Sequence, residues 1–288
     1  MSFTPRIKAI LWILTWSISF TTTMAINKTL SHAMSDFTKV FVRSVFGYVF
    51  LFPLIFHTGL KKTFTTNHLP LHLLRAILGG GAIAATYYAY SHLTMSLATT
   101  IGFTQPMVIA LFAILFLREW LSWDKWVAII AGYVGVLIAI NPFQYGFDPD
   151  IFIAFLANIL SSGAIILSRK LTKTDTNATI LVYFNTIVMC LSGVLAFFHW
   201  TPLETSDLIR LFFMGGMATL SQYSYVQAVR HGEASLVAPF EYSRLVFAIP
   251  VGLFFFSEPV HFSTLLAALI IVGSNLYMVY KRNPSKHP

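Results

Sequence analysis

Ten apolar stretches of membrane-spanning length follow one another along this chain of 288 residues. A helix needs about 17 to 25 such residues to cross roughly 30 Å of hydrocarbon. The stretches lie at 7–27, 38–59, 72–92, 96–117, 126–141, 151–168, 178–199, 208–229, 234–257 and 262–280. The connections between them are short, so no separate soluble domain of ordinary size fits among them. The sequence predicts an all-α integral membrane protein with ten transmembrane helices.

The composition agrees with this interpretation. Hydrophobic residues make up 56% of the chain and charged residues 10%, and the mean hydropathy is +0.71, well outside the range of soluble proteins. Continuous apolar runs such as MVIALFAILFL at 107–117 differ from the alternating segments of about ten residues that form a membrane β-barrel. Arg6 and Lys8 precede the first stretch as in a signal peptide, but no small-residue cleavage site follows, so we expect an uncleaved first helix.

Lysine and arginine are distributed unevenly between alternate connections. When the amino terminus is placed inside, fourteen of them fall on the inner side, and the outer connections contain only Lys28, Lys39 and Arg210. Positive residues accumulate on the cytoplasmic side of membrane proteins. The distribution predicts that both termini are cytoplasmic. The net charge of +8 then comes mostly from inner connections that face anionic membrane lipid, so no nucleic-acid partner is needed.

The two halves of the chain contain similar sequences. RAILGGGAIAATYYAYSHLTMSLATTI begins at Arg75, and RLFFMGGMATLSQYSYVQAVRHGEASLVA begins 135 residues later at Arg210. The same offset aligns Gly80, Gly81, Tyr88 and Tyr90 with Gly215, Gly216, Tyr223 and Tyr225. Each half has five stretches, an odd number, so the second half must enter the membrane from the opposite side, with Arg75 at the inner face and Arg210 at the outer. The sequence predicts two inverted five-helix repeats, 7–141 and 151–281, as in secondary transporters with a solute site between the repeats.

Further matches connect the ends of the halves. A glutamate follows the fourth and ninth stretches (LFLRE at Glu119, FFFSE at Glu258), and each half ends in a Gly-containing apolar run (AGYVGVLIAI, LIIVGSNLYMV). With the ten stretches and the repeat, these features resemble the drug/metabolite transporter superfamily, and within it proteins made of two EamA domains. The stretch APFEYSRL at 238–245 is similar to the S-adenosylmethionine uptake transporters of intracellular bacteria. The resemblance implies a secondary transporter of the bacterial inner membrane that moves a small metabolite by alternating access.

Two charges interrupt the ninth stretch, Glu241 and Arg244. A charge at the bilayer centre costs about 2.5–3.5 kcal/mol on insertion scales, so each should face a partner or a cavity. Residues three apart share one helix face, so one interpretation is that they neutralise each other and hold the bundle together. A second is that Pro239 and Pro250 loosen the helix, so that Glu241, Tyr242 and Arg244 face a central cavity and bind a zwitterionic solute. A third is that Glu241 couples transport to protons.

Other polar and aromatic residues are candidates for the walls of that cavity. Arg43 lies about one turn inside the second stretch, where it either extends to the interface or binds a carboxylate. Aromatic walls suit a planar base or a sulfonium. Glu119 and Glu258 are expected to anchor loops, and the glycines at 79–81 and 215–216 to let helices approach closely. The remaining candidates are Trp16, Tyr87, Tyr88, Tyr90, Gln105, Asn158, Ser161, Gln222 and Tyr223.

Enzyme motifs are not found in the sequence. It contains no H-E-x-x-H, no G-x-S-x-G, no P-loop and no Cys/His cluster with metal-ligand spacing. We therefore expect no catalytic residue, metal or cofactor, and transport driven by a gradient or by exchange. Export of amino acids or drugs is an alternative function, and a non-transporting structural or sensory membrane protein is another. The sequence leaves the oligomeric state open.

Overall fold

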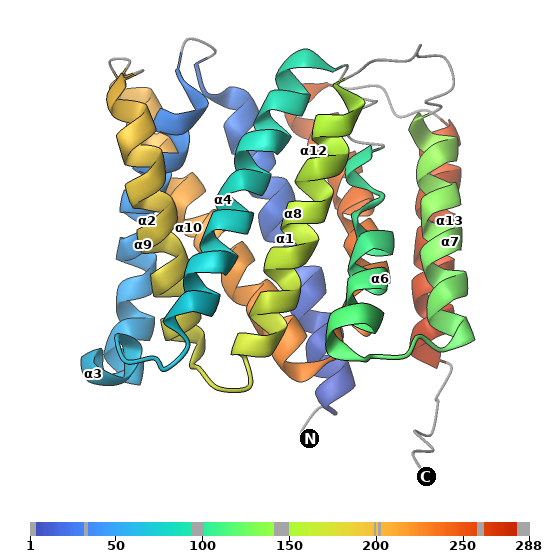
Figure 1. Cartoon of the computed structure of the whole chain (residues 1–288). Helices are drawn as coiled ribbons and strands as arrows, with labels where there is room; N and C mark the ends of the chain where they lie inside the picture. The colour runs from blue at the N-terminus through green and yellow to red at the C-terminus, as the bar shows by residue number, and fades with distance from the viewer. Residues whose placement is uncertain are drawn as a thin grey trace.

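The computed structural model of the chain is a bundle of helices that run side by side, with the start of α1 and the end of α13 at the same end of the bundle (Figure 1). It describes residues 4–31, 34–93, 101–140, 150–198, 200, 203–257 and 262–280, and within them it contains helices and no strands. The helices are α1 (Pro5–Thr29), α2 (Asp36–Thr58), α3 (Leu60–Thr63), α4 (Leu69–His92), α6 (Gln105–Leu117), α7 (Trp123–Ile140), α8 (Ile151–Leu171), α9 (Asn177–Phe198), α10 (Thr205–His231), α11 (Ala234–Val237), the 3-10 segment η2 (Ala238–Tyr242), α12 (Ser243–Phe256) and α13 (Phe262–Tyr280). The prediction of an all-α fold is confirmed.

Six helical segments are long and apolar enough to cross a membrane. They are Pro5–Thr29, Asp36–Thr58, Leu69–Thr86, Ile151–Leu171, Asn177–Phe198 and Ala234–Phe256. The other four predicted stretches fall on α6, α7, α10 and α13, which are helical but do not meet the same measure of length and apolarity over the described residues. The chain therefore has six clear apolar spans.

Helices pack chiefly against helices of the other half of the chain. α1 packs against α10 and α12, and α4 packs against α8 and α9. α2 packs against α9 and α10, α6 against α8, and α7 against α13. The two halves therefore interleave, and each apolar core cluster draws on both of them, as in the cluster of Ile13, Trp16, Ala228 and Phe240.

Many side chains of α1 carry hydroxyl groups. The helix begins after Thr4, whose side chain accepts a hydrogen bond from the Ile7 amide at 3.4 Å, with Pro5 in the first helical position. Farther along, Thr15, Ser19 and Thr23 each donate to the carbonyl oxygen four residues earlier, at 2.8–2.9 Å. These bonds satisfy the hydroxyl groups inside the helix, so α1 remains compatible with a membrane.

The ninth apolar stretch is a broken helix. One turn of α-helix, α11, is followed by the 3-10 segment η2 around Pro239, and the α-helix resumes as α12. Proline lacks the amide hydrogen that an α-helix needs at this position. The expected loosening at Pro239 is therefore present, whereas α12 continues through Pro250. Every residue from Ala234 to Ser243 is buried.

Glycines bring helices into close contact at the predicted places. A Cβ atom on Gly215 of α10 would lie 2.7 Å from the Arg43 carbonyl oxygen of α2. A Cβ atom on Gly216 would lie 2.8 Å from the ring of Phe50, and one on Gly79 would lie 2.6 Å from the ring of Phe184. Gly80 differs, because its nearest neighbour lies at an ordinary 3.9 Å. Three of these glycines therefore allow close helix packing, as expected.

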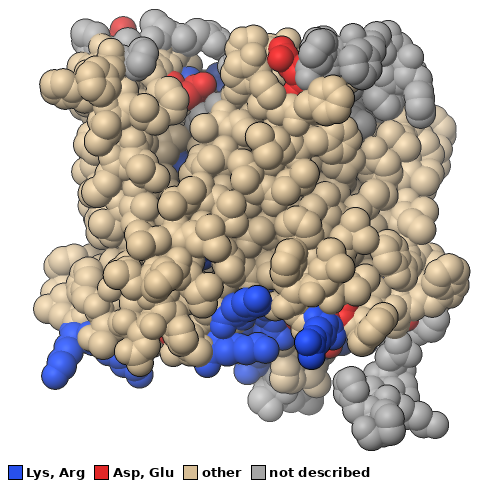
Figure 2. Space-filling model, viewed as in Figure 1, with Lys and Arg blue, Asp and Glu red and all other residues tan. Residues whose placement is uncertain are grey.

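Basic residues gather at the end of the bundle where α1 begins and α13 ends (Figure 2). One of the residues assigned to that end is an exception. Arg75 is only 3% exposed, because its guanidinium lies inside the bundle between α8, α9 and α10. Arg75 lies in the second turn of α4, close to this end of the bundle, but its side chain points into the bundle, which a count of basic residues along the sequence cannot show.

Candidate functional site

Glu241 lies in η2 and is completely buried, with 0% of its surface exposed. The Tyr225 hydroxyl on α10 donates a hydrogen bond to its Oε1 atom at 2.5 Å. Its Oε2 atom has no hydrogen-bond partner among the described residues. An unsatisfied buried acceptor costs about 1–3 kcal/mol, and more when it is charged. One oxygen of this carboxylate is therefore available to accept a hydrogen bond or to face a cation.

Tyr242 lies beside Glu241 and is also fully buried. Its ring stacks on Phe103 with ring centres 6.0 Å apart, and it fills the space over Gly132, where a Cβ atom would lie 2.4 Å away. Its hydroxyl group has no hydrogen-bond partner among the described residues. Two neighbouring side chains of η2 thus each present an unpaired polar atom inside the bundle.

Arg244 lies on α12 and has partners of its own. Its Nη2 atom donates to the Gly102 carbonyl oxygen at 3.2 Å. Its guanidinium carbon lies 4.4 Å from the ring centre of Phe103 and 5.6 Å from that of Phe20. Ring faces attract cations, so these aromatic side chains stabilise the charge.

No ion pair within 4 Å joins Glu241 and Arg244 in the described part of the chain. Glu241 binds Tyr225, and Arg244 binds Gly102 and Phe103. The two side chains therefore do not bind each other directly, and the interpretation that their charges neutralise each other stays a prediction. Glu241 packs against α10 through Tyr225, whereas Arg244 packs against the segment before α6 through Gly102.

Asn158 holds the segment before α6 against α8. It is 5% exposed, and its Nδ2 atom donates to the Ile101 carbonyl oxygen at 2.6 Å and to Thr104 Oγ1 at 2.9 Å. Because the same segment contains Gly102, Asn158 and Arg244 bind its backbone from opposite elements. Asn158 therefore positions the wall beside Arg244. Gln105, half-buried, begins α6 directly after this wall.

Trp16 forms the α1 side of the site. It is 7% exposed, its ring lies 5.3 Å from that of Tyr225 at 79°, and it stacks on Phe20 at the same centre distance. The hydroxyl of Ser17, the next residue of α1, lies 2.7 Å from that of Ser243 on α12. We define the Glu241 site as Glu241, Tyr242, Arg244, Tyr225, Trp16, Phe20 and Phe103.

Arg43 and Gln222 do not lie in the Glu241 site. They line a cavity of about 30 Å³ between α2, α9 and α10, together with Ser44, Asn185 and Thr219. The Gln222 Oε1 atom accepts a hydrogen bond from Arg75 Nη2 at 3.3 Å. The structure therefore divides the predicted binding residues between the Glu241 site and this second cavity.

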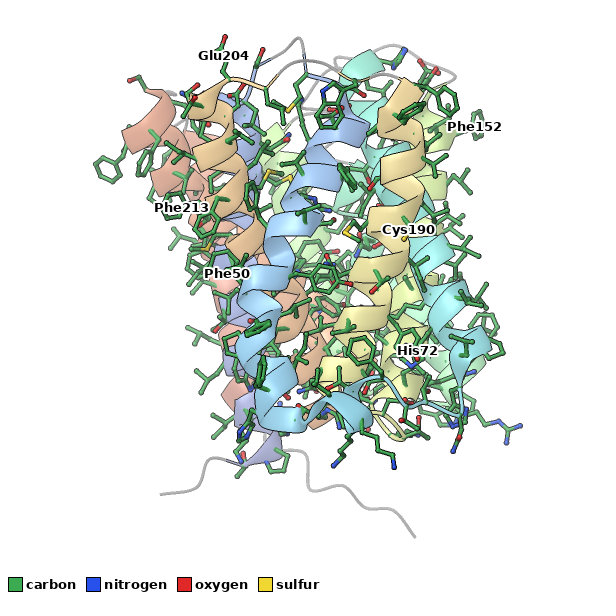
Figure 3. The ribbon with its side chains drawn as sticks, turned by 90° about the vertical axis from the view of Figure 1, so that its left-hand side faces the viewer. Phe50, His72, Phe152, Cys190, Glu204 and Phe213 are labelled. Carbon is green, nitrogen blue, oxygen red and sulfur yellow. The ribbon has the colours of Figure 1, made fainter. Side chains whose placement is uncertain are left out.

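Two further candidates, Tyr223 and Tyr88, line neither the Glu241 site nor this cavity. Tyr223 faces an apolar groove of about 600 Å³ between α2 and α10, and its hydroxyl accepts a hydrogen bond from Gln227 at 2.7 Å. Figure 3 shows Phe50 and Phe213 from the walls of that groove on one side of the bundle. Tyr88 is 39% exposed and donates to Asp150 at 3.5 Å. The side chains of Tyr87 and Tyr90, and all of Glu258, lie outside the described residues.

Several functional neighbours were missed from the sequence. Tyr225 was noted only as a repeat match, and Phe20 and Phe103 were not singled out. Their role depends on how α1, α10 and the segment before α6 meet η2, which spacing along one helix does not reveal. Ser17 was only weakly indicated by the sequence, because it is one of many hydroxyl residues in the first apolar stretch.

Glu119 anchors connections at the end of the bundle that carries most lysines and arginines. Its Oε1 atom accepts from Arg169 Nε at 3.3 Å, and its Oε2 atom accepts from the Ser235 amide at 3.2 Å. Lys125 pairs with Glu233 and donates to the Ser235 hydroxyl at 2.9 Å. Burial by itself raises the pKa of Glu233, but Lys125 and Ser235 more than offset this, so its pKa is lowered and it stays ionised. These contacts tie residues of both halves together.

Arg169→Gln is expected to destabilise the protein more than Lys125→Gln. The side chains of Arg169 and Glu119 are 18% and 11% exposed, and Arg169 also donates to the Val229 carbonyl oxygen. Loss of these charged hydrogen bonds should cost about 1–3 kcal/mol. Lys125 pairs with a Glu233 side chain that is 50% exposed, so its loss should cost about 0–1 kcal/mol. Thermal unfolding of the purified variants measures both; equal losses would contradict this assignment.

Comparison with known proteins adds independent evidence. Residues 7–141 and 149–280 match the model of the EamA-like transporter family. An S-adenosylmethionine uptake transporter of Rickettsia felis is 27% identical over 93% of this chain and 91% of its own length. A riboflavin transporter of Rhizobium johnstonii is 26% identical over 96% of this chain and 93% of its own length.

A solved crystal structure gives further support for the fold. It superposes with a TM-score of 0.80 over 97% of this chain and 99% of its own, at 15% identity, so this likeness shows the fold alone. The family match and the names of the relatives point to a transporter rather than an enzyme, and the apolar helices make it a multi-pass membrane protein. Since the family match covers nearly the whole chain, this protein belongs to the EamA-like transporter family.

Proposed function

We propose that this protein is a secondary transporter that takes up S-adenosylmethionine across the bacterial inner membrane. The observation that carries the proposal is the Glu241 site, which combines a buried carboxylate, a guanidinium and aromatic rings. The relatives named as S-adenosylmethionine uptake transporters support the same solute. S-Adenosylmethionine carries a carboxylate, an ammonium, a sulfonium and a planar adenine, so each part of the solute has a complementary group in this site.

Each side chain of the site has a proposed role. Arg244 binds the solute carboxylate, because a guanidinium presents several donors and uses only one of them on Gly102 in the described residues. The free oxygen of Glu241 faces the positive charges of the solute. Trp16, Phe20 and Phe103 provide faces for the adenine or the sulfonium. Tyr242 adds its hydroxyl group.

The proposal includes two inverted repeats, 7–141 and 151–281. The packing supports it, because contacts occur in matched pairs: the first helix of one half packs on the third of the other, α1 on α10 and α8 on α4, and the fifth helices pack together, α7 on α13. Figure 3 places His72, near the start of α4, at the lower end and Glu204, just before α10, at the upper end. The third helices of the two halves, α4 and α10, therefore begin at opposite ends of the bundle, which supports an inverted arrangement.

Orientation and driving force are also proposals. Both termini lie in the cytoplasm, supported by the clustering of lysine and arginine at that end of the bundle. The solute crosses by alternating access, in which the interleaved halves rearrange about the buried Glu241 site. Exchange with another solute or an ion or solute gradient drives the transport.

The proposal is tested by uptake of radiolabelled S-adenosylmethionine into bacteria that express the chain, with empty-vector cells as the control. We expect saturable uptake that S-adenosylhomocysteine and unlabelled solute reduce and that methionine alone reduces little, because methionine lacks the adenine. If riboflavin competes instead, the solute would be the one named for the riboflavin transporter of Rhizobium johnstonii. Loss of preloaded solute faster than in control cells would indicate export. No uptake by cells that contain the inserted protein would contradict the proposed solute.

A further inference from the structure

The small cavity around Arg43 lies between α2, α9 and α10 and shares no lining residue with the Glu241 site. Its polar lining residues are Arg43, Ser44, Asn185, Thr219 and Gln222. The volume of about 30 Å³ is close to the share of one water molecule in the liquid. The cavity is therefore far too small for a metabolite with an adenine ring, but it has room for an ion of about the size of a water molecule.

The charge around this cavity is positive. Arg75 is 3% exposed and donates only to neutral acceptors: Ser168 Oγ at 2.5 Å, the Ile180 carbonyl oxygen at 3.2 Å and Gln222 Oε1 at 3.3 Å. Its guanidinium carbon lies 4.3 Å from the ring centre of Phe184, which is also a lining residue. No carboxylate among the described residues forms an ion pair with Arg75.

Arg43 adds a second guanidinium to the same cavity. Its Nε atom is buried and has no hydrogen-bond partner among the described residues, and no described carboxylate pairs with it. An arginine cannot lose its proton in a protein, so both side chains remain charged. In a bilayer, a buried charge without a counter-charge is costly. Two cations beside one polar cavity therefore favour an anion in that cavity.

We propose that the Arg43 cavity binds a small monovalent anion, with chloride as the ion of best fit. Arg43 holds it directly through its unpaired Nε group. Arg75 does not line the cavity, but it donates a hydrogen bond to the Oε1 atom of Gln222 and adds its positive charge nearby. The amide nitrogen of Gln222 is then left as a hydrogen-bond donor for the anion. The anion lies between α2, α9 and α10, and it offsets the repulsion between the two arginines. The carboxylate of a solute is the other negatively charged group that could occupy this cavity.

The test is the anion dependence of thermal unfolding of the purified full chain, because this readout does not require transport. Sodium chloride is compared with sodium gluconate at equal ionic strength, with bromide, nitrate, sulfate and acetate as further arms. Chloride and bromide should raise the Tm by about 2–4 °C in a saturable manner, since binding to the folded state alone stabilises it. Sulfate is larger and divalent, so it should not raise the Tm in this way.

Two variants and a matched control make the test specific. Arg43→Gln should remove the chloride-dependent rise in Tm. Thr219→Leu fills the cavity without changing its charge, and it should also remove the chloride-dependent rise in Tm. The proposal can therefore still be tested if the Arg43 variant fails to fold. Arg210→Gln removes a guanidinium that pairs with Asp207 outside the cavity, and it should retain the rise. Equal Tm values in chloride and gluconate, stabilisation by acetate but not by halides, or retention of the rise in both cavity variants would overturn the proposal.

Discussion

Arg244→Gln is expected to reduce solute uptake by about 10- to 100-fold, which corresponds to the loss of a charge-assisted hydrogen bond. The amount of inserted protein should stay unchanged, because Arg244 makes one hydrogen bond to the Gly102 carbonyl oxygen that glutamine can also make. What glutamine lacks is the positive charge for a solute carboxylate and the planar cation that lies over Phe103. Uptake of labelled S-adenosylmethionine at several concentrations, normalised to inserted protein, measures the change.

Control variants separate binding from folding. Arg244→Lys keeps the charge but not the planar fork, so it should recover only part of the uptake. Arg210→Gln should transport at the parental rate, since that side chain pairs with Asp207 and is 45% exposed. Glu241→Gln should also abolish uptake if its free oxygen faces a cationic group of the solute. Parental uptake by both Arg244→Gln and Glu241→Gln would show that the solute binds elsewhere.

Gly215→Ala is expected to lower the stability of the protein by about 1–3 kcal/mol, the usual cost of overpacking. A Cβ atom at this position would lie 2.7 Å from the Arg43 carbonyl oxygen and 3.1 Å from the Gly47 amide nitrogen. Both are backbone atoms, so α2 and α10 would have to separate. The thermal unfolding temperature of the purified variant measures the effect.

Gly273→Ala provides the matched control for this substitution. Gly273 also lies inside a helix, but no described atom comes within 4 Å of its Cβ position. Alanine favours a helix over glycine by about 0.8–1 kcal/mol, so this variant should be slightly stabilised. A Gly215→Ala variant as stable as Gly273→Ala would mean that the contact between α2 and α10 is looser than described.

Helix positions were largely predictable from the sequence, because a membrane requires long apolar runs and each run must satisfy its own backbone. The two charges of the ninth stretch were predictable as unusual for the same reason, and the break at Pro239 followed from its missing amide hydrogen. Glycine positions such as Gly215 were predictable as contacts, since apolar helices in lipid approach through small residues.

The partners of the charged residues were not predictable. The spacing of Glu241 and Arg244 suggested a pair, but Glu241 binds Tyr225 on α10 and Arg244 lies over the ring of Phe103. The position of Arg75 near a helix start did not reveal that its side chain is buried and binds Ser168 and Gln222. Such contacts join residues 16 to 147 positions apart, so they depend on packing between helices and cannot be read from the local periodicity of the sequence.

The measurement that tests the central claim most directly is exchange in liposomes that contain the purified protein. Liposomes are loaded with unlabelled S-adenosylmethionine, and labelled solute is added outside. A transporter that exchanges this solute should produce a transient accumulation of label above that in protein-free liposomes, and Arg244→Gln should abolish it. Equal label in both kinds of liposome, with folded parental protein present, would contradict the claim that this chain transports S-adenosylmethionine.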